Sequence, residues 1–399
     1  MIGTKHSDAG YAEEAKLPRR DWILLPALGL ATVCLLAGGV ELGARRMMTS
    51  LPTIAEDCLV LNDLSGVRGI HNCVVWEKMP ESELTEYRFN SSGYRNDIDL
   101  GPKSPDTYRI VVVGTSMAAG FRVPREKTFG ALLPAELSRR TGRKVELYNE
   151  ALAWRFPRSL ARFFNEAIAA KPDMILWVLA PADIGDPWLM RADPSKSLNV
   201  RARVWYIIKD AFATRSFKES VALVFSRTRT ATLLADLLFA SPSQYVKSSL
   251  LQGSYKSEFL QADPNPDWQG RLKEFDSNAA NIEGQASKAG IPLVAVFLPD
   301  RTQVAMISLM GDWPKGFDPY KLDNDLRTII MSHGGTYVDI LLDFRTIPNP
   351  QLGYYAIDGH PNAAGHAIIT RFLSDKLVDG AVAGLGAIGP QRAGSEPRQ

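Results

Sequence analysis

Ser116, Asp358 and His360 are residues whose types could together perform nucleophilic chemistry. Ser116 lies in the stretch Gly114-Thr115-Ser116, and Asp358 and His360 stand two positions apart in IDGHPNAAGH. A serine hydroxyl is a weak nucleophile that needs a base within hydrogen-bond reach, and that base needs an acidic group to fix its tautomer. We therefore expect a Ser-His-Asp triad if the fold brings the two segments together.

Each of these residues alone has a more ordinary explanation. Most G-x-S sites are turns or helix caps, and a loop histidine or aspartate is commonly exposed to solvent. Ala118 replaces the second glycine of a G-x-S-x-G nucleophile elbow, which argues against the α/β-hydrolase arrangement. The combination of all three residues at one predicted sheet edge favours the triad, because ligands bind at the carboxyl ends of parallel strands.

The elements that must position these residues alternate regularly from Tyr108 onward. The predicted strands are short, apolar runs, as in strands buried on both faces of a sheet, and cover 108–113, 144–148, 174–180, 292–298 and 336–340. The predicted helices are 128–141, 157–170, 268–289, 320–332 and 363–377. This alternation predicts an α/β fold of three layers, α/β/α, with a parallel five-stranded sheet like that of flavodoxin. Ser116 would follow the first strand, and the pair Asp358 and His360 would precede the last helix.

The alternation is interrupted between residues 187 and 267. This segment contains the apolar stretches 204–212, 221–225 and 232–239 and is too long to be a loop. We interpret it as a helical insertion that packs on the sheet, and the alternatives are a lid or a surface that rests on a membrane. From 379 to 399 the chain is rich in Gly, Ala and Pro, which predicts a disordered tail.

Residues 22–42 form an apolar stretch near the N-terminus. Most of this stretch, WILLPALGLATVCLLAGGV, carries no charge, and a helix of this length crosses a hydrocarbon core of about 30 Å. A slight excess of basic residues before it predicts that segment 1–21 is cytoplasmic and that the remainder is extracytoplasmic. We interpret the stretch as an uncleaved single-pass anchor in the cytoplasmic (inner) membrane, and a cleaved signal peptide is the alternative.

Cys58 and Cys73 lie in the juxtamembrane region 43–84. Export would permit a disulfide between them that closes a loop of about 15 residues and adds about 3 kcal/mol of stability, whereas two buried thiols are the alternative. The chain has 3 Cys and 5 His without CxxC or HExxH, so we expect no metal and no organic cofactor. Its 46 basic residues nearly balance 44 acidic ones, and we therefore expect no nucleic-acid partner.

Residues 85–378 resemble the SGNH hydrolases, the GDSL-like lipases and esterases. The stretch 114–129, GTSMAAGFRVPREKTF, is similar to the first block of that family, with Ser116 in the place of the nucleophile. The stretch 148–154, YNEALAW, resembles the second block, and DGHPNAAGH resembles the last. The stretch 87–96, YRFNSSGYRN, is similar to the lead-in strand of membrane-anchored bacterial members.

The resemblance implies acyl-ester hydrolysis or transfer by Ser116, His360 and Asp358. It also implies that the oxyanion is held by the backbone N–H groups of Ser116 and Ala151, with Asn149 close by. The third block of the family ends in an Asn whose side chain donates to the oxyanion, and here Ala180-Pro181-Ala182-Asp183 has no such donor. Losing one oxyanion donor typically lowers kcat by about 10²–10³. The candidates for a substitute donor are Arg122, Asn149 and Trp154.

The substrate that the resemblance implies is a short acyl ester, such as acetyl, on an envelope or exported glycan. Two alternatives stay open. A non-catalytic protein that binds or assembles glycans would keep the fold but lose the oxyanion donor, as Ala182 suggests. A lysophospholipase-type enzyme would act on a lipid, with the insertion 187–267 as its lid.

Overall fold

The computed structural model describes residues 18, 20–62, 66–96, 99–184, 228–251, 257–382 and 385. The predicted apolar stretches 204–212 and 221–225 lie outside the described residues. The chain divides into two compact units, Met1–Met47 and Met48–Gln399.

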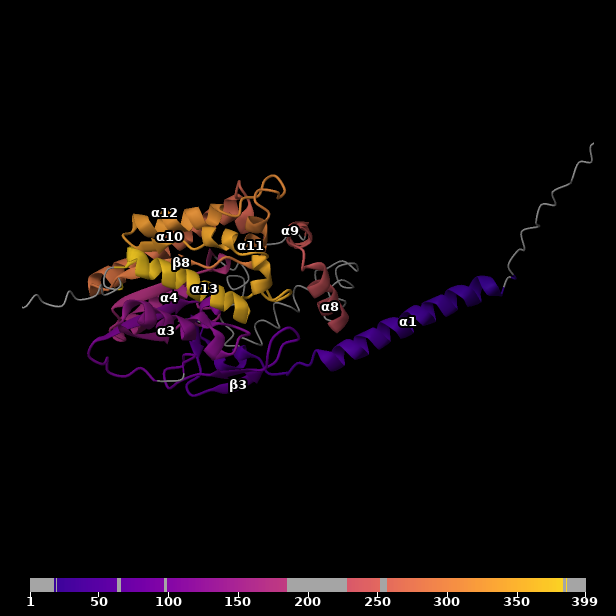
Figure 1. The fold of residues 1–399 in the computed structure, drawn as a ribbon, viewed down its shortest axis with the longest axis horizontal. Helices are drawn as coiled ribbons and strands as arrows, with labels where there is room; N and C mark the ends of the chain where they lie inside the picture. The colour runs from indigo at the N-terminus through magenta and orange to yellow at the C-terminus, as the bar shows by residue number, and fades with distance from the viewer. Residues whose placement is uncertain are drawn as a thin grey trace, which may run out of the picture. The chain divides into compact units, whose positions relative to one another are not determined.

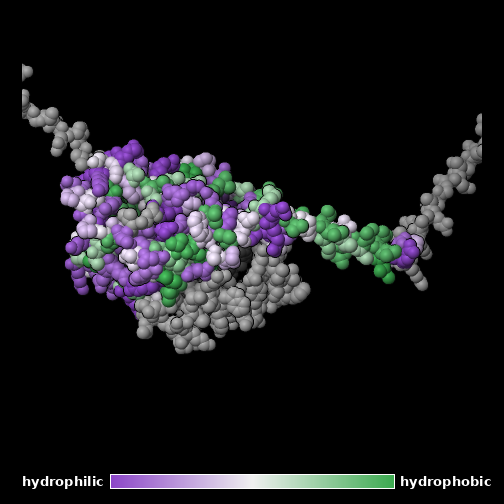
Figure 2. All heavy atoms as spheres, turned by 90° about the horizontal axis from the view of Figure 1, so that it is seen from below, coloured by the Kyte–Doolittle hydropathy of each residue, from purple (hydrophilic) through white to green (hydrophobic). Residues whose placement is uncertain are grey.

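The first unit contains one long helix, α1 (Asp21–Met47), which includes the predicted apolar stretch 22–42. Its 27 residues give a length of about 40 Å at about 1.5 Å per residue. Leucine and other apolar side chains are exposed along the helix, as the green surface in Figure 2 shows. Its most apolar 18-residue window has a mean hydropathy of 2.2, and the helix is long and apolar enough to cross a membrane, a property that an N-terminal signal sequence shares.

The second unit is built on a parallel five-stranded sheet in the order β6-β5-β7-β8-β9. Its strands are β5 (Thr107–Gly114), β6 (Lys144–Asn149), β7 (Met174–Leu179), β8 (Leu293–Phe297) and β9 (Thr336–Val338). Every neighbouring pair runs parallel, as the apolar runs predicted. The prediction of an α/β fold around this sheet is confirmed.

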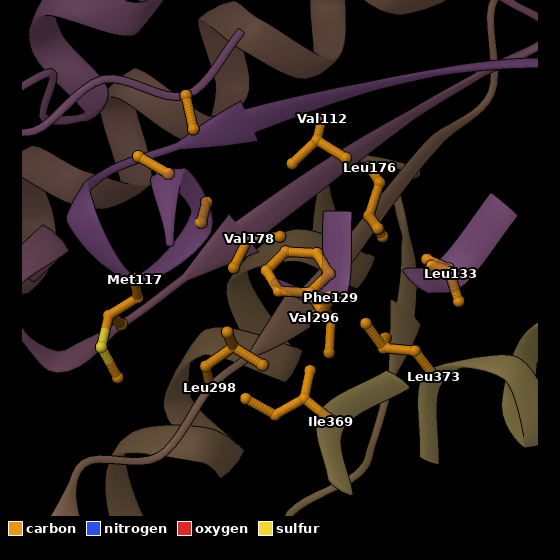
Figure 3. Close-up of a cluster of buried hydrophobic side chains, with 14 of the residues drawn as sticks. Val112, Met117, Phe129, Leu133, Leu176, Val178, Val296, Leu298, Ile369 and Leu373 are labelled. Atoms are coloured by element: carbon orange, nitrogen blue, oxygen red, sulfur yellow. The ribbon is translucent and has the colours of Figure 1, made fainter. Parts of the chain in front are cut away.

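Helices cover both faces of the sheet. The first helical layer consists of α3 (Phe129–Thr141) and α13 (Ala363–Lys376), and the second of α4 (Pro157–Ala169), α10 (Pro266–Ala289) and α12 (Lys321–Ser332) (Figure 1). The first core joins strand residues to apolar residues of α3 and α13. Figure 3 shows Val112, Leu176, Val178 and Val296 packed beside Phe129, Leu133, Ile369 and Leu373. Removing these side chains from water stabilises the sheet by about 25 cal/mol per Å² of apolar surface.

Two small antiparallel sheets precede the parallel sheet. Their strands are β1 (Leu59–Asn62) with β2 (Gly66–Gly69), and β3 (Val74–Glu77) with β4 (Thr85–Arg88). A disulfide joins Cys58, the last residue of η1 (Ala55–Cys58), to Cys73, with their Cα atoms 5.7 Å apart. The pairing of β3 with β4 crosses the predicted boundary between residues 84 and 85, so the juxtamembrane region belongs to the same compact unit as the large sheet.

The remaining helices are shorter. They are α2 (Ser116–Ala119), η2 (Arg125–Lys127), η3 (Pro181–Ile184), α8 (Arg229–Leu238), α9 (Pro242–Leu251), η4 (Glu258–Leu260), α11 (Arg301–Ser308), η5 (Leu342–Thr346), η6 (Pro350–Gly353) and η7 (Leu377–Ala381). The predicted stretch 232–239 falls almost entirely within α8.

The predicted start of the disordered tail at residue 379 is wrong. Val382 and Leu385 are buried in the core beneath α3 and α13, at 4% and 0% exposure. Burial of these two apolar side chains favours a fixed position for both of them. The rest of the predicted tail, from 386 to 399, lies outside the described residues.

Candidate active site

Ser116 begins α2 immediately after the carboxyl end of β5. The sharp change of direction depends on Gly114, whose φ is 150°. A Cβ atom at this position would lie 2.5 Å from the backbone oxygen of Val178 on the neighbouring strand. Glycine is therefore required both for the backbone conformation and for the close approach of β7.

Asp358 and His360 lie on the loop between η6 and α13. The carboxylate of Glu81 accepts hydrogen bonds from the backbone N–H groups of Ile357, at 3.1 Å, and Asp358, at 2.8 Å. Gly359, between the two candidate residues, has a φ of 83°, which only glycine adopts without strain. The loop is thus held at its start by a side chain from outside the parallel sheet.

The three predicted triad residues form a continuous chain of hydrogen bonds. The Nε2 atom of His360 lies 2.8 Å from the Oγ atom of Ser116, and the Nδ1 atom of His360 lies 2.5 Å from the Oδ1 atom of Asp358. With its proton on Nδ1, the imidazole donates to the carboxylate and leaves Nε2 free to accept the serine proton. The arrangement can therefore generate a serine nucleophile.

The environment of Asp358 keeps this carboxyl ionised. Burial alone would raise its pKa, but the charge and hydrogen bond of His360 and the charge of Arg122 together hold the pKa well below its ordinary value. The Nε atom of Arg122 lies 3.4 Å from Oδ2 of Asp358. An ionised Asp358 is the form that can fix the tautomer of His360.

A cavity of about 560 Å³ opens beside the triad. Ser116, Asp358 and His360 all line it. Other walls come from the turn after β6, from η3 and from residues of α9, η4, α10 and α11. The side chains on these walls include Trp154, Ala182, Tyr245, Phe259, Trp268 and Arg271. This volume and its mixed apolar and polar lining are typical of a site for a small organic ligand.

The predicted oxyanion roles of Ala151 and Asn149 need correction. The N–H of Ala151 donates to the side-chain oxygen of Asn149 at 3.0 Å, and the Asn149 side-chain nitrogen donates to the carbonyl of Ala118 at 2.8 Å. Both residues are buried, and neither lines the cavity. Their hydrogen-bonding groups hold the turn after β6 in place and are not free for a substrate.

Trp154, five residues past Asn149, lines the cavity instead. It adopts a left-handed conformation with a φ of 67°, which is uncommon for a bulky residue and often marks a functional position. Within the described part of the chain, no acceptor receives a hydrogen bond from its backbone N–H. Nothing in the sequence signals this conformation, because the position has no glycine.

Ala182 lines the cavity and has no polar group to offer there. The next residue, Asp183, is fully buried and turns back into the fold. Its Oδ2 atom accepts from the backbone N–H of Ala180 at 2.6 Å, and burial raises its pKa to about 7 despite that bond and one from Thr115. Asp183 therefore shapes η3 and does not face the substrate.

His366, the other histidine near the site, has a structural role. It is fully buried, and its Nδ1 atom accepts from the backbone N–H of Phe129 at 3.2 Å. Burial lowers its pKa to about 3, so the imidazole stays neutral. Among the described residues, no group of three or more His, Cys, Asp or Glu is placed to hold a metal ion.

No protein-family model matches the sequence, and no curated protein matches it either. Among solved structures, the chain is similar to TesA, with 13% identity and a TM-score of 0.37 over 67% of this chain and 97% of TesA. It is similar to the esterase EstA from Pseudoalteromonas sp., with 10% identity and a TM-score of 0.32 over 67% of this chain and 95% of EstA. It is also similar to the acetyl xylan esterase AlAXEase, with 11% identity and a TM-score of 0.36 over 67% of this chain and 98% of that protein. Likenesses this distant assign neither an activity nor a substrate to this chain.

Proposed function

We propose that this chain is a membrane-anchored serine esterase of the SGNH type whose catalytic unit lies outside the cytoplasmic membrane. The observation that carries the proposal is the hydrogen-bonded series Ser116, His360 and Asp358 at the edge of a cavity large enough for a substrate. The motifs around Ser116 and His360 that resemble the SGNH hydrolases support the same activity. Helix α1 supports the anchor, and the disulfide supports export, because disulfides persist mainly in oxidising compartments.

In the proposed reaction, Ser116 Oγ attacks the ester carbonyl carbon while its proton passes to Nε2 of His360. The carbonyl oxygen becomes an oxyanion, which the backbone N–H groups of Ser116 and Trp154 stabilise. The tetrahedral intermediate then expels the alcohol, which takes the proton from His360. Water, or the hydroxyl of an acceptor, attacks the acyl-enzyme and gives hydrolysis or transfer.

The preferred substrate in this proposal is a short acyl ester on an envelope or exported glycan. Among the described residues that line the cavity, Ser249, Glu258 and Arg271 carry hydroxyl or charged side chains. A ligand rich in hydroxyl groups can exchange hydrogen bonds with such side chains. A lipid chain would cover them without hydrogen bonds, which disfavours the lysophospholipase alternative.

The proposal is tested by hydrolysis of p-nitrophenyl acetate with the full-length protein in detergent. We expect turnover by the wild type and its loss in Ser116→Ala, while circular dichroism shows that the variant is folded. A matched control is Ser287→Ala, because Ser287 is exposed on α10 and is not among the residues that line the cavity. Equal turnover by wild type and Ser116→Ala, on acetate and on longer acyl chains, would show that Ser116 is not a catalytic nucleophile.

That result would favour the second candidate function, a non-catalytic glycan-binding protein. The observation that supports it is Ala182, which leaves the cavity without the side-chain oxyanion donor expected at this position. Binding of acetylated oligosaccharides by the full-length protein, measured by calorimetry, would then be the next experiment.

A further inference from the structure

Arg122 lines the cavity beside the carboxylate of Asp358, and its charge helps to keep that carboxyl ionised. Its Nε atom is 3.4 Å from Oδ2 of Asp358, whereas Oδ1 of the same carboxylate is bound to His360. A second guanidinium nitrogen forms an ion pair with Glu77, the last residue of β3. Only 12% of the Arg122 side chain and 1% of the Glu77 side chain is exposed. The guanidinium therefore links the carboxylate of Asp358 to the buried carboxylate of Glu77.

The backbone of Arg122 is held as firmly as its side chain. Its φ of 67° is in the left-handed region, which is unfavourable for a residue with a Cβ atom. The hydroxyl of Tyr87 accepts from the backbone N–H of Arg122 at 2.6 Å. The hydroxyl of Tyr355 donates to its carbonyl at 2.7 Å. The two tyrosines lie on β4 and on the loop that carries Asp358. Their hydrogen bonds fix the backbone from which the Arg122 side chain extends.

We propose that Arg122 is the positioning residue of the triad. It holds Asp358 so that Oδ1 stays on Nδ1 of His360, and Glu77 holds the guanidinium in turn. This inference rests on the proposed esterase function. It also gives the segment before the parallel sheet a part in organising the active site, because Glu77 follows the disulfide-linked Cys73 by four positions on the same hairpin.

The charges around His360 predict how the reaction depends on pH when Arg122 is removed. The titratable groups that surround Arg122 and His360 are Asp358, Glu56, Glu77, Glu81, Tyr87, Tyr355 and His366. Burial raises the pKa of Glu56 and of Glu81, and it lowers the pKa of His366 to about 3, so the imidazole of His366 is neutral. Loss of the Arg122 cation therefore leaves a more negative surrounding, which favours the protonated imidazole and moves the acid limb of kcat/KM to higher pH.

The test is the pH profile of p-nitrophenyl acetate hydrolysis by full-length variants in detergent. Arg122→Met should lower kcat about tenfold to a hundredfold, less than loss of the triad carboxylate itself, and move the acid limb up by about one pH unit. Arg122→Lys keeps the charge, so its acid limb should stay close to that of the wild type. Because Arg122→Met leaves Glu77 buried and unpaired, the double variant Arg122→Met/Glu77→Gln provides a neutral pair that can fold.

The matched control is Arg139→Met, which removes an Arg–Glu pair on the surface, where 68% of the arginine side chain is exposed. Wild-type kcat in the folded double variant would overturn the inference. So would a loss of kcat in Arg122→Met without any movement of the acid limb, because that loss would reflect packing alone. If Ser116→Ala is as active as the wild type in the same assay, the proposed esterase function fails instead, and the two failures are thereby distinguished.

Discussion

The Nε2 atom of His360 lies 2.8 Å from the Oγ atom of Ser116, although 244 positions separate the two residues in the sequence. The parallel sheet makes this possible, since Ser116 directly follows the carboxyl end of β5. The loop that carries His360 leads into α13, which packs beside α3 on the same face of the sheet. The hydrogen bond therefore depends on the packing of the whole α/β unit.

Replacing Asp358 by asparagine should preserve the fold and remove most of the activity. The amide cannot hold His360 in the tautomer that leaves Nε2 free, so we expect kcat to fall by about 10³–10⁴. Turnover of p-nitrophenyl acetate measures the effect, with circular dichroism as the check on folding. A loss of less than about tenfold would show that Asp358 does not orient the base.

Replacing Ala182 by asparagine should increase activity. Ala182 lines the cavity at the position where the resemblance to the SGNH hydrolases implies a side-chain donor to the oxyanion, and an added donor strengthens transition-state binding. We expect kcat to rise by about tenfold or more. Ala182→Leu is the control, because it adds bulk without a donor and should slow the reaction. If both variants are equally slow, position 182 is not at the oxyanion.

The sequence predicts the parallel sheet well for a physical reason. Strands buried on both faces need continuous apolar residues, and β7 has only such residues, so its pattern is visible without any tertiary information. The helix after His360 can also be predicted from the sequence, because Asn362 is a favoured helix cap. In the structure it caps α13 by accepting from the N–H of Gly365.

The four strands before the sheet could not be predicted in the same way. Each has only four residues, and in β3 and β4 buried and more exposed positions alternate over too short a length to show a period. The sequence could not show that the N–H of Ala151 is occupied, because Ala151 and Trp154 lie on one turn and only tertiary structure reveals which N–H has a partner. The position of Arg122 beside Asp358 likewise depends on a left-handed backbone that carries no glycine signal.

Replacing Glu283 on α10 by glutamine should increase the stability of the protein at high pH. Only 5% of the residue is exposed, its Oε1 atom has no hydrogen-bond partner among the residues that the structure describes, and burial raises its pKa from 4.5 to about 8. Between these two pH values the folded state retains a proton that the unfolded state loses, so stability falls as the pH rises. Glu283→Gln should therefore be more stable than the wild type at pH 8, by about 1–3 kcal/mol, and similar to it at pH 4.

Thermal unfolding of the two proteins across this pH range tests the prediction. Glu274→Gln, on the same helix but with 39% of the glutamate side chain exposed, is the matched control and should change little. A wild type that is as stable as Glu283→Gln at pH 8 would mean that Glu283 has a partner in solution.

Removing the disulfide should destabilise the catalytic unit. Cys58→Ser/Cys73→Ser frees a loop of about 15 residues in the unfolded state, and we expect a loss of about 3 kcal/mol. Calorimetry of the variant, and of the wild type with dithiothreitol, should give the same lowered melting temperature. Cys34→Ser in α1 is the control. A shift smaller than about 1 °C would show that the hairpins fold without the crosslink.

The most direct measurement of the central claim is covalent labelling of Ser116 by a fluorophosphonate, followed by intact mass and peptide mapping of the full-length protein. The triad predicts one adduct per chain, located on Ser116, absent from Ser116→Ala and formed far more slowly by His360→Ala, because only an activated serine reacts. An adduct that persists in Ser116→Ala, or no adduct under conditions that label a known serine esterase, would contradict the account.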